Sequence, residues 1–366
     1  MKRIDIGQTS ANFFVKKIYA LCLKLPGLHN FSMIELHVWG YDEEVSIISP
    51  SCIASAWLLS LVVEPQGVPF EVIPSNNTHL SKLNELPLLI DEGEEYNGFR
   101  EIATHLTTKY DSSRISSLSD EQKLLDNSLI TFLDTKFDAL NRYNLFSNTK
   151  NYENYTRKLF AKFFPFPMMY NQALKFYNDA QSRVRLLGLG EHKSSFLNFT
   201  GSGEDTQTEY FNSDYDDGID NSKAISSLHE KSLVQKSETK KVLRESRSSM
   251  KCLLLVGQFF ERLEKLKLEQ KHEGKFLFGE KPAASDILFL AYFFALTNDS
   301  LPDKFIRNFL SSDNADRFKS ILDRLADVKS KSVRLSFRNP VGKERPNLVN
   351  EVGYWTGLID YHSDRA

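Results

Sequence analysis

The chain has 366 residues, which is long enough for two domains. Its formal net charge of −2 and its pI near 6.5 give no reason to expect nucleic acid as a main partner. Its three cysteines, Cys22, Cys52 and Cys252, are widely spaced and odd in number, so they argue against a secreted disulfide framework and favour a reducing compartment. The longest clean apolar run, residues 287–296, is about half of the ~20 residues that a membrane-spanning helix needs.

Residues 1–33 form a basic leader that we expect to be poorly ordered. Up to residue 32 its only acidic residue is Asp5, and lysines interrupt its apolar segment, residues 13–23. Two other interpretations stay open. The segment is compatible with a basic amphipathic helix on a membrane surface, and with translation that starts at Met33, directly before the first strand pattern.

Residues 34–112 alternate between strand and helix patterns. A short β-rich run at 36–39 ends in Trp39. A helix is expected over 49–63, because Ser49 is a suitable N-cap and Pro50 stands at the first helical position, where no amide donor is needed. The body of this helix, which includes Trp57, is apolar nearly all round, so we expect it to be covered on most sides.

Three further strands and a helix are predicted downstream. Residues 70–74 and 86–90 are strand-like, the second containing Pro87, and residues 94–96 can pair back across a turn at 91–93. Apolar residues then recur at helical spacing from Phe99 to Tyr110. This order resembles the thioredoxin-type half of the glutathione-transferase fold, and the resemblance implies a cis bond at Leu86–Pro87.

Residues 119–187 are predicted to be helical. Ser119 and Gln122 form a capping-box pattern, and Asn151 is a candidate cap for a second helix. Pro165 and Pro167 must end that helix, and a third helix is expected over 168–187.

The composition then changes. Residues 188–249 contain an acidic block followed by a basic one, with little apolar periodicity, so we expect a disordered charged insertion. The alternatives are a charged segment that binds a partner and a phosphorylation target. Helical patterns resume over 250–328, which completes the helical domain, and residues 329–366 are a polar C-terminal tail. Its aromatic patch, Tyr354 and Trp355 with Leu358 and Ile359, is expected to dock onto the body or a partner.

Asp286 marks the start of an apolar helix in this second domain. Glutathione-transferase-like proteins usually carry Ser or Thr three residues earlier, which completes a reciprocal cap. Ala283 holds that place here, so only the aspartate half is expected.

No catalytic, cofactor-binding or metal-binding residues are predicted. Ser49 occupies the position where redox relatives carry their reactive cysteine, and Cys52 the position of the resolving one, without a neighbouring cation to stabilise a thiolate. Where serine-type transferases grip glutathione, this chain has Asn97-Gly98-Phe99, which lacks the hydroxyl. The histidines show no metal-ligand spacing.

Three stretches resemble the metaxin family more specifically. The first is Leu36-His37-Val38-Trp39-Gly40 with the following Ser46–Ser49 and Trp57. The second is Ser75-Asn76-Asn77-Thr78-His79-Leu80-Ser81. The third runs from Leu145 through Asn154 to Phe160 and ends in Phe166-Pro167-Met168-Met169-Tyr170-Asn171. The last resembles the fungal metaxin-like subunit of the mitochondrial outer-membrane sorting and assembly machinery.

This resemblance implies an α/β domain plus an all-α domain and a non-catalytic subunit, peripheral on the cytosolic face of the outer membrane, that supports β-barrel precursor insertion and release. The implied partners are a barrel-forming core subunit, a second metaxin-like subunit and an import-translocase receptor. A contact surface is expected among Lys158, Phe160, Phe163, Phe164, Phe166, Met168 and Met169, although core filling explains these aromatics equally well. The alternative functions are a glutathione or thiol transferase that uses Ser49 or Cys52, and the transferase-like module of an elongation factor subunit.

Overall fold

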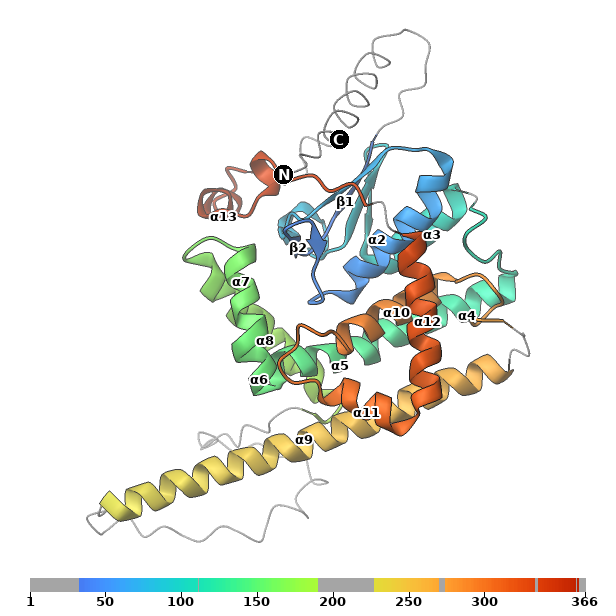
Figure 1. Ribbon diagram of the computed structural model, residues 1–366. Coiled ribbons are helices and arrows are strands. Elements are labelled where there is room, and N and C mark those ends of the chain that lie inside the picture. The colour runs from blue at the N-terminus through green and yellow to red at the C-terminus, as the bar shows by residue number, and fades with distance from the viewer. Residues whose placement is uncertain are drawn as a thin grey trace, which may run out of the picture.

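The computed structural model describes residues 33–110, 112–189, 227–269, 274–332, 335–359 and 361. It has an N-terminal α/β domain against which a larger helical domain packs, and the end of the chain returns to the first domain (Figure 1). The fold class is therefore that predicted: glutathione-transferase-like, thioredoxin-like then all-helical. The predicted leader lies outside the described residues, except for Met33.

The N-terminal sheet has the strand order β4-β1-β5-β6. Strand β1 (Ile34–His37) runs parallel to β4 (Phe70–Ile73) and antiparallel to β5 (Leu88–Asp91), which forms a hairpin with β6 (Glu94–Asn97). The hairpin and the cis bond at Leu86–Pro87 confirm two of the predictions. A small second hairpin of β2 (Gly40–Tyr41) and β3 (Glu44–Val45) was not predicted.

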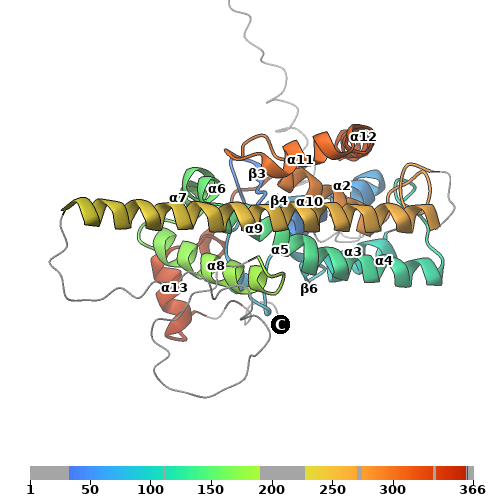
Figure 2. The ribbon, with the colours of Figure 1, turned by 90° about the horizontal axis from the view of Figure 1, so that it is seen from below.

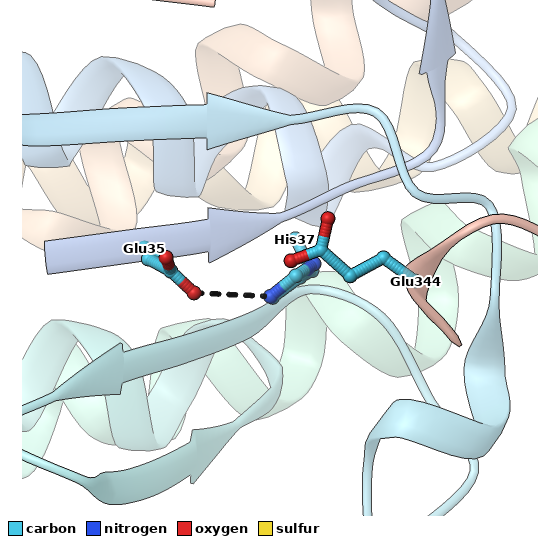
Figure 3. Close-up of side chains that lie close together, drawn as sticks. All are labelled: Glu35, His37 and Glu344. Atoms are coloured by element: carbon cyan, nitrogen blue, oxygen red, sulfur yellow. Dashed lines mark ion pairs between the residues drawn. The ribbon is translucent and has the colours of Figure 1, made fainter. Parts of the chain in front are cut away.

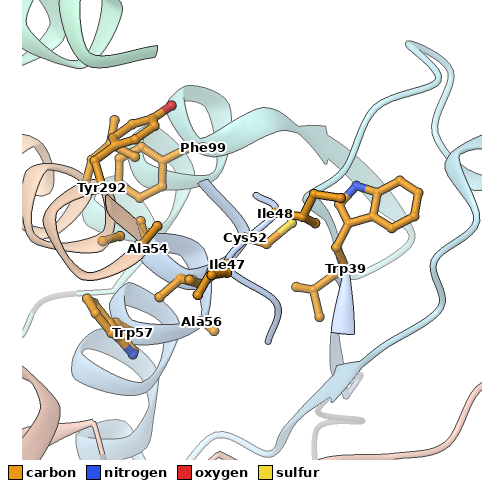
Figure 4. Close-up of a cluster of buried hydrophobic side chains, with 14 of the residues drawn as sticks. Trp39, Ile47, Ile48, Cys52, Ala54, Ala56, Trp57, Phe99 and Tyr292 are labelled. Carbon is orange, nitrogen blue, oxygen red and sulfur yellow. The ribbon is translucent and has the colours of Figure 1, made fainter. Parts of the chain in front are cut away.

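Helix α2 (Pro50–Val63) is the centre of the molecule. Every residue in it except Ser51 is buried, because the sheet and α3 (Gly98–Lys109) cover one side and α10 (Ala284–Leu296) covers another. Figure 4 shows part of the cluster, with Cys52 between Trp39 and Tyr292. Pro50 stands in the first turn as predicted, but the Ser49 side chain makes no capping hydrogen bond, which corrects its predicted role.

The helical domain begins with the predicted capping box of Ser119 and Gln122. Helix α4 (Asp120–Phe132) continues through a π-helical turn, Leu133–Phe137, into α5 (Asp138–Arg142) and a second π-helical turn, Tyr143–Ser147. Next come α6 (Thr149–Asn151), a π-helical turn over Tyr152–Thr156, and α7 (Arg157–Phe163).

Asn148, and not Asn151, caps this second helical segment. The Asn148 side chain accepts a hydrogen bond from the Asn151 amide at 3.1 Å. Asn151 is fully buried and instead joins two segments, because its side chain donates to the Asn144 side chain at 2.9 Å and accepts from the Asp303 amide at 2.7 Å. The sequence analysis assigned the cap to Asn151, whereas the tertiary contacts of Asn151 give it a different role.

Helix α8 (Met168–Arg185) follows the predicted proline break, and Phe166–Pro167 is a second cis bond. Helix α9 (Ser227–Glu269) corrects the predicted disordered insertion, since regular structure begins at residue 227 and not at 250. Residues 190–226 of that insertion lie outside the described residues. Figure 2 shows α9 running along the helical domain and extending past α7 and α8.

The second half of the helical domain contains α10, α11 (Phe305–Asp313) and α12 (Ala315–Lys331). The Asp286 carboxylate accepts hydrogen bonds from the Ala283 amide at 3.0 Å and the Leu277 amide at 3.2 Å, as the aspartate half of the cap requires. The missing hydroxyl of Ala283 is replaced from another helix, because Asp126 of α4 accepts from the Ser285 amide at 3.0 Å.

The predicted polar tail is in large part folded. It contains a 3₁₀ turn, Gly342–Glu344, and α13 (Leu348–Trp355), and it lies beside the edge of the sheet. Within the described residues, no helix combines the length and the apolar character needed to cross a membrane.

Candidate functional site

The N-terminus of α2 is where a thiol enzyme of this fold would carry its nucleophile. Cys52 is fully buried, and burial raises the pKa of its thiol to about 12, although hydrogen bonds with the Ser49 side chain and the Trp39 backbone act in the opposite direction. A thiol with so high a pKa stays protonated near neutral pH, so it is a poor nucleophile. Cys52 therefore behaves as a small core residue.

The opposite wall is formed at the start of α3, where polar groups are hydrogen-bonded within the domain. Ser81 donates a hydrogen bond to the Asn97 side-chain oxygen at 2.5 Å, and the Asn97 amide donates to the Glu101 carboxylate at 2.8 Å. Gly98 follows with a φ of 72°, a conformation that glycine adopts readily. The one side-chain amide oxygen that this stretch offers thus already accepts a hydrogen bond from within the domain.

A cleft with a volume of about 390 Å³ remains between the two domains, and Ser49, Pro87 and Tyr292 are among its lining residues. Asp134, from the first π-helical turn, accepts hydrogen bonds in this cleft from the Ser51 hydroxyl at 3.1 Å and the Tyr292 hydroxyl at 3.2 Å. Burial raises the pKa of Asp134 to about 6, against the opposing effect of these two hydrogen bonds. These two hydrogen bonds make this part of the cleft polar.

Two arginines of the helical domain line the same cleft, and aspartates already hold both. Arg142 lies 2.6 Å from Asp138 and 2.8 Å from Asp179, and Arg183 lies 3.3 Å from Asp138. These ion pairs connect α5 to α8. The arginines therefore stabilise the helical wall instead of presenting free positive charge to an anionic ligand.

Some residues of the predicted contact surface around α7 and α8 are buried and others are exposed. Phe160, Phe163, Phe164 and Met168 are core residues, which corrects their assignment to a surface, whereas Phe166 is 76% exposed. Phe163 and Phe164 pack on Trp39 with ring centroids 5.7 Å and 6.0 Å away.

Much of the aromatic surplus is therefore used where the two domains meet. Met169 is partly buried, and Lys158 is exposed. Phe166 and Lys158 remain available at the surface.

The returning tail pairs with the edge of the sheet. The Val72 amide of β4 donates to the Ser336 carbonyl at 2.7 Å, and the Arg338 amide donates back to the Val72 carbonyl at 3.0 Å. Phe337 lies parallel to β4 between them. The tail thereby covers a strand edge that would otherwise expose unpaired backbone groups.

Arg338 fixes this tail to three carboxylates. Its guanidinium lies 2.8 Å from Glu71, 2.9 Å from each Glu344 oxygen and 3.4 Å from Glu35. Burial alone would raise the pKa of Glu344, but the hydrogen bonds from Arg338 and the Val341 amide outweigh it and lower that pKa.

His37 completes this cluster. Figure 3 shows Glu35, His37 and Glu344 with their ligand-type atoms turned toward one another, and those atoms all lie within 4.8 Å. Such a set resembles a metal-ligand group, which the spacing of the histidines in the sequence did not predict. A guanidinium already supplies positive charge at this place, so the geometry is explained as an ion-pair network.

A second anchor joins the tail to the segment before β5. The His79 ring stacks on Tyr354 at 4.1 Å and its Nε2 lies 3.1 Å from the Glu351 carboxylate. The neighbouring Asn77 side chain donates to the Lys343 carbonyl at 3.2 Å. The predicted tail patch is thus divided: Tyr354 and Ile359 are partly buried, whereas Trp355 and Leu358 are exposed.

Asn76 explains another part of the segment that resembles metaxins. Its side-chain oxygen accepts from the Gly40 amide and its side-chain nitrogen donates to the Gly40 carbonyl, both at 2.9 Å. One buried amide thus pairs with both backbone groups of Gly40, at the start of the small hairpin. This role depends on a contact between segments, so sequence patterns gave no sign of it.

Two family models match the sequence. The model described as "Outer mitochondrial membrane transport complex protein" (Tom37) matches residues 52–177, and the Tom37 C-terminal domain model matches residues 203–358. Together they include most of the chain.

Curated relatives include Metaxin-3 of Xenopus laevis, with 27% identity over 42% of this chain and 48% of that protein. The Metaxin-1 homolog of Drosophila melanogaster is 27% identical over 44% of this chain and 50% of that protein. The matched region spans about half the length of these relatives.

Solved structures of similar shape include a glutathione S-transferase of Ceriporiopsis subvermispora in complex with glutathione, with a TM-score of 0.47, 11% identity and coverage of 81% of this chain and 98% of that one. FzlA from C. crescentus has a TM-score of 0.41 and 13% identity, covering 82% of this chain and 89% of that one. The strand order and the cis-proline, and not these scores, support the fold assignment. The two family models and the metaxin relatives show that this chain belongs to the metaxin-like Tom37 family of outer mitochondrial membrane transport complex proteins.

Proposed function

We propose that this chain is a non-catalytic subunit of the mitochondrial outer-membrane sorting and assembly complex, where it supports β-barrel precursor insertion and release from the cytosolic side. The match to an outer-membrane transport complex family carries this proposal. The buried Cys52 thiol and the engaged Asn97 amide support it, because both wall positions of a thiol site serve the fold instead.

The proposed partners are a barrel-forming core subunit, a second metaxin-like subunit and an import-translocase receptor. Part of the contact surface is proposed at Lys158 and Phe166, and Tyr170, in the first turn of α8, extends it. The Phe166 and Tyr170 rings lie 6.2 Å apart, and both side chains are more than half exposed. Large exposed aromatics of this kind commonly dominate the free energy of protein–protein binding.

The proposal is tested by affinity purification of the tagged full chain from detergent-solubilised mitochondria, followed by mass spectrometry. We expect recovery of an outer-membrane barrel protein together with a second metaxin-like chain. The double variant Phe166→Ser with Tyr170→Ser should recover less of them at an unchanged melting temperature. Leu268→Ser, which alters an equally exposed residue of α9, is the matched control.

The competing function is a glutathione or thiol transferase, and the open cleft beside Ser49 is the observation that favours it. Retention on glutathione-agarose together with turnover of chlorodinitrobenzene, both lost in Ser49→Ala, would establish the enzyme and overturn the proposed function. We expect neither retention nor turnover.

A further inference from the structure

The outer face of α13 carries an apolar surface that the body of the molecule does not cover. Its exposed members share one side of the helix and the turn after it. They are Leu348, Val349, Val352, Trp355 and Leu358, and we call them the α13 face. Their spacing from Leu348 through Val352 to Trp355 is the helical one, so the side chains form one continuous stripe.

The opposite side of the same helix is fixed to the protein, so the orientation of the α13 face is set. Tyr354 stacks on His79, and Glu351 pairs with the same histidine. Gly353 is buried because Ile359 folds back against it: a Cβ at Gly353 would lie 2.6 Å from the Ile359 side chain. The Leu358 and Ile359 amides both donate to the Gly353 carbonyl, which closes the helix end.

The Trp355 ring is exposed, and its polar N–H group already has a hydrogen-bond acceptor within the protein. Its indole N–H donates to the Glu351 carboxylate at 3.0 Å, so the ring does not need water to satisfy its one donor. It is 73% exposed, whereas Trp39 and Trp57 are 4% and 6% exposed. A large ring held outward in this way gains free energy when an apolar phase covers it.

Basic residues precede the α13 face in the chain. Lys343 and Arg345 are exposed, and the two acidic residues between residues 343 and 358, Glu344 and Glu351, are engaged by Arg338 and His79. The surface therefore combines an apolar stripe containing tryptophan with neighbouring positive charge. This composition is typical of helices that lie in the headgroup region of a bilayer.

We propose that the α13 face docks on an anionic lipid surface, with Trp355 and Leu358 entering the interface and Lys343 and Arg345 facing phosphate headgroups. The position of α13 favours this partner, because the helix lies at the rim of the molecule in both ribbon views (Figures 1 and 2) and its apolar side chains are exposed. This surface deepens the proposed function, which places the chain at a membrane.

The test uses the purified full chain and protein-free vesicles of phosphatidylcholine, with or without phosphatidylserine. The chain has three tryptophans and two are buried, so a change in emission on binding reports mainly Trp355. We expect a blue shift and co-sedimentation with the anionic vesicles, and quenching by brominated acyl chains. Trp355→Phe should abolish the shift and keep most of the co-sedimentation, which assigns the signal.

Variants identify the surface. Trp355→Ala combined with Leu358→Ser should lower the vesicle partition coefficient by roughly tenfold or more, as expected for losing buried apolar area. Leu254→Ser, on an exposed position of α9, is the control and should bind normally. Lys343→Ala with Arg345→Ala should remove the preference for anionic vesicles.

Two outcomes would overturn the proposal. One is the absence of both shift and co-sedimentation with either vesicle. The other is equal binding by the Trp355 and Leu358 double variant. A face that is protected only when other protein subunits are present would assign it to a protein contact instead. Because the vesicles contain no protein, failure here leaves the complex membership proposed above intact, and failure of the purification experiment leaves the lipid result intact.

Discussion

At the scale of single residues, the fold depends on polar side chains that complete the backbone of a distant segment. Asp126 serves the start of α10 in place of the absent hydroxyl at Ala283, and Asn76 pairs with both backbone groups of Gly40. Asn151 joins Asn144 to Asp303. Losing one such partner leaves buried backbone groups unsatisfied, which costs more free energy than the hydrogen bond itself contributes.

Replacing Asn76 tests this directly. Asn76→Gly removes both hydrogen bonds to Gly40 and should lower the free energy of unfolding by about 2–3 kcal/mol. Asn76→Ala should cost roughly 1 kcal/mol more, because Asn76 has a φ of 52°, where a Cβ is unfavourable. Urea denaturation measures both, and equal effects of the two variants would contradict the contribution assigned to φ.

Asp134 is expected to make the free energy of unfolding depend on pH. Burial raises its folded pKa to about 6, above the ordinary aspartate value of 3.8, so its stabilising contribution is complete below pH 3.8 and is lost as the pH rises through 6. Asp134→Asn should therefore raise the free energy of unfolding by about 1–3 kcal/mol at pH 8, and the gain should vanish near pH 4. Urea denaturation across this pH range provides the measurement. A gain that is independent of pH would contradict the raised pKa.

At the scale of elements, the tail acts as an added edge strand that one arginine holds in place. Arg338 contacts Glu35 of β1, Glu71 of β4 and Glu344 of the tail, so a single guanidinium joins three segments. The backbone pairing around Val72 depends on this junction, because the segment contributes only a few hydrogen bonds of its own.

Arg338→Ala should detach the tail before the rest of the sheet. We expect the Val72 amide, which donates to Ser336, to exchange its hydrogen at least about tenfold faster, with a loss of roughly 1–3 kcal/mol in stability. Arg345→Ala, an exposed arginine in the same segment, should leave the exchange rate unchanged. Hydrogen exchange read by NMR or mass spectrometry measures both. Unaltered protection of Val72 in Arg338→Ala would show that the backbone pairing alone holds the tail.

At the scale of the whole molecule, the two domains share one hydrophobic core. Trp39 of the first domain packs on Phe163, Phe164 and Phe176 of the second, and α2 packs on α10. The fold is glutathione-transferase-like, and Cys52 and the Asn97 side chain make internal contacts within it. Unfolding is therefore expected to be one cooperative transition.

Trp39→Ala should weaken this junction. We expect a loss of about 3–5 kcal/mol, the usual result of removing a buried aromatic ring, and separation of the single transition into two. Calorimetry detects the splitting. Phe166→Ala, which truncates an exposed aromatic of the same helical region, should change stability by less than about 0.5 kcal/mol. A single, unshifted transition in Trp39→Ala would contradict a shared core.

Patterns within short segments predicted much of this architecture. The apolar helix around Trp57, the Pro87 turn, the hairpin after Asp91 and the capping box at Ser119 all follow from local rules, and the structure agrees. The roles of Asp126 and Arg338 were missed because each depends on a partner far along the chain. Burial of Phe160 and exposure of Phe166 could not be distinguished for the same reason, since neighbouring aromatics of one segment differ only in what packs against them.

The junction at Arg338 also has a consequence for synthesis. Glu35 and Arg338 are separated by 303 residues, so at roughly 5–20 residues per second a ribosome needs about 15–60 s to deliver the arginine after the glutamate. From the synthesis of β4 until that arginine is delivered, the outer side of β4 has no covering strand. The nascent chain therefore exposes an unpaired strand edge during most of its synthesis. We expect chaperones to bind this edge during that period.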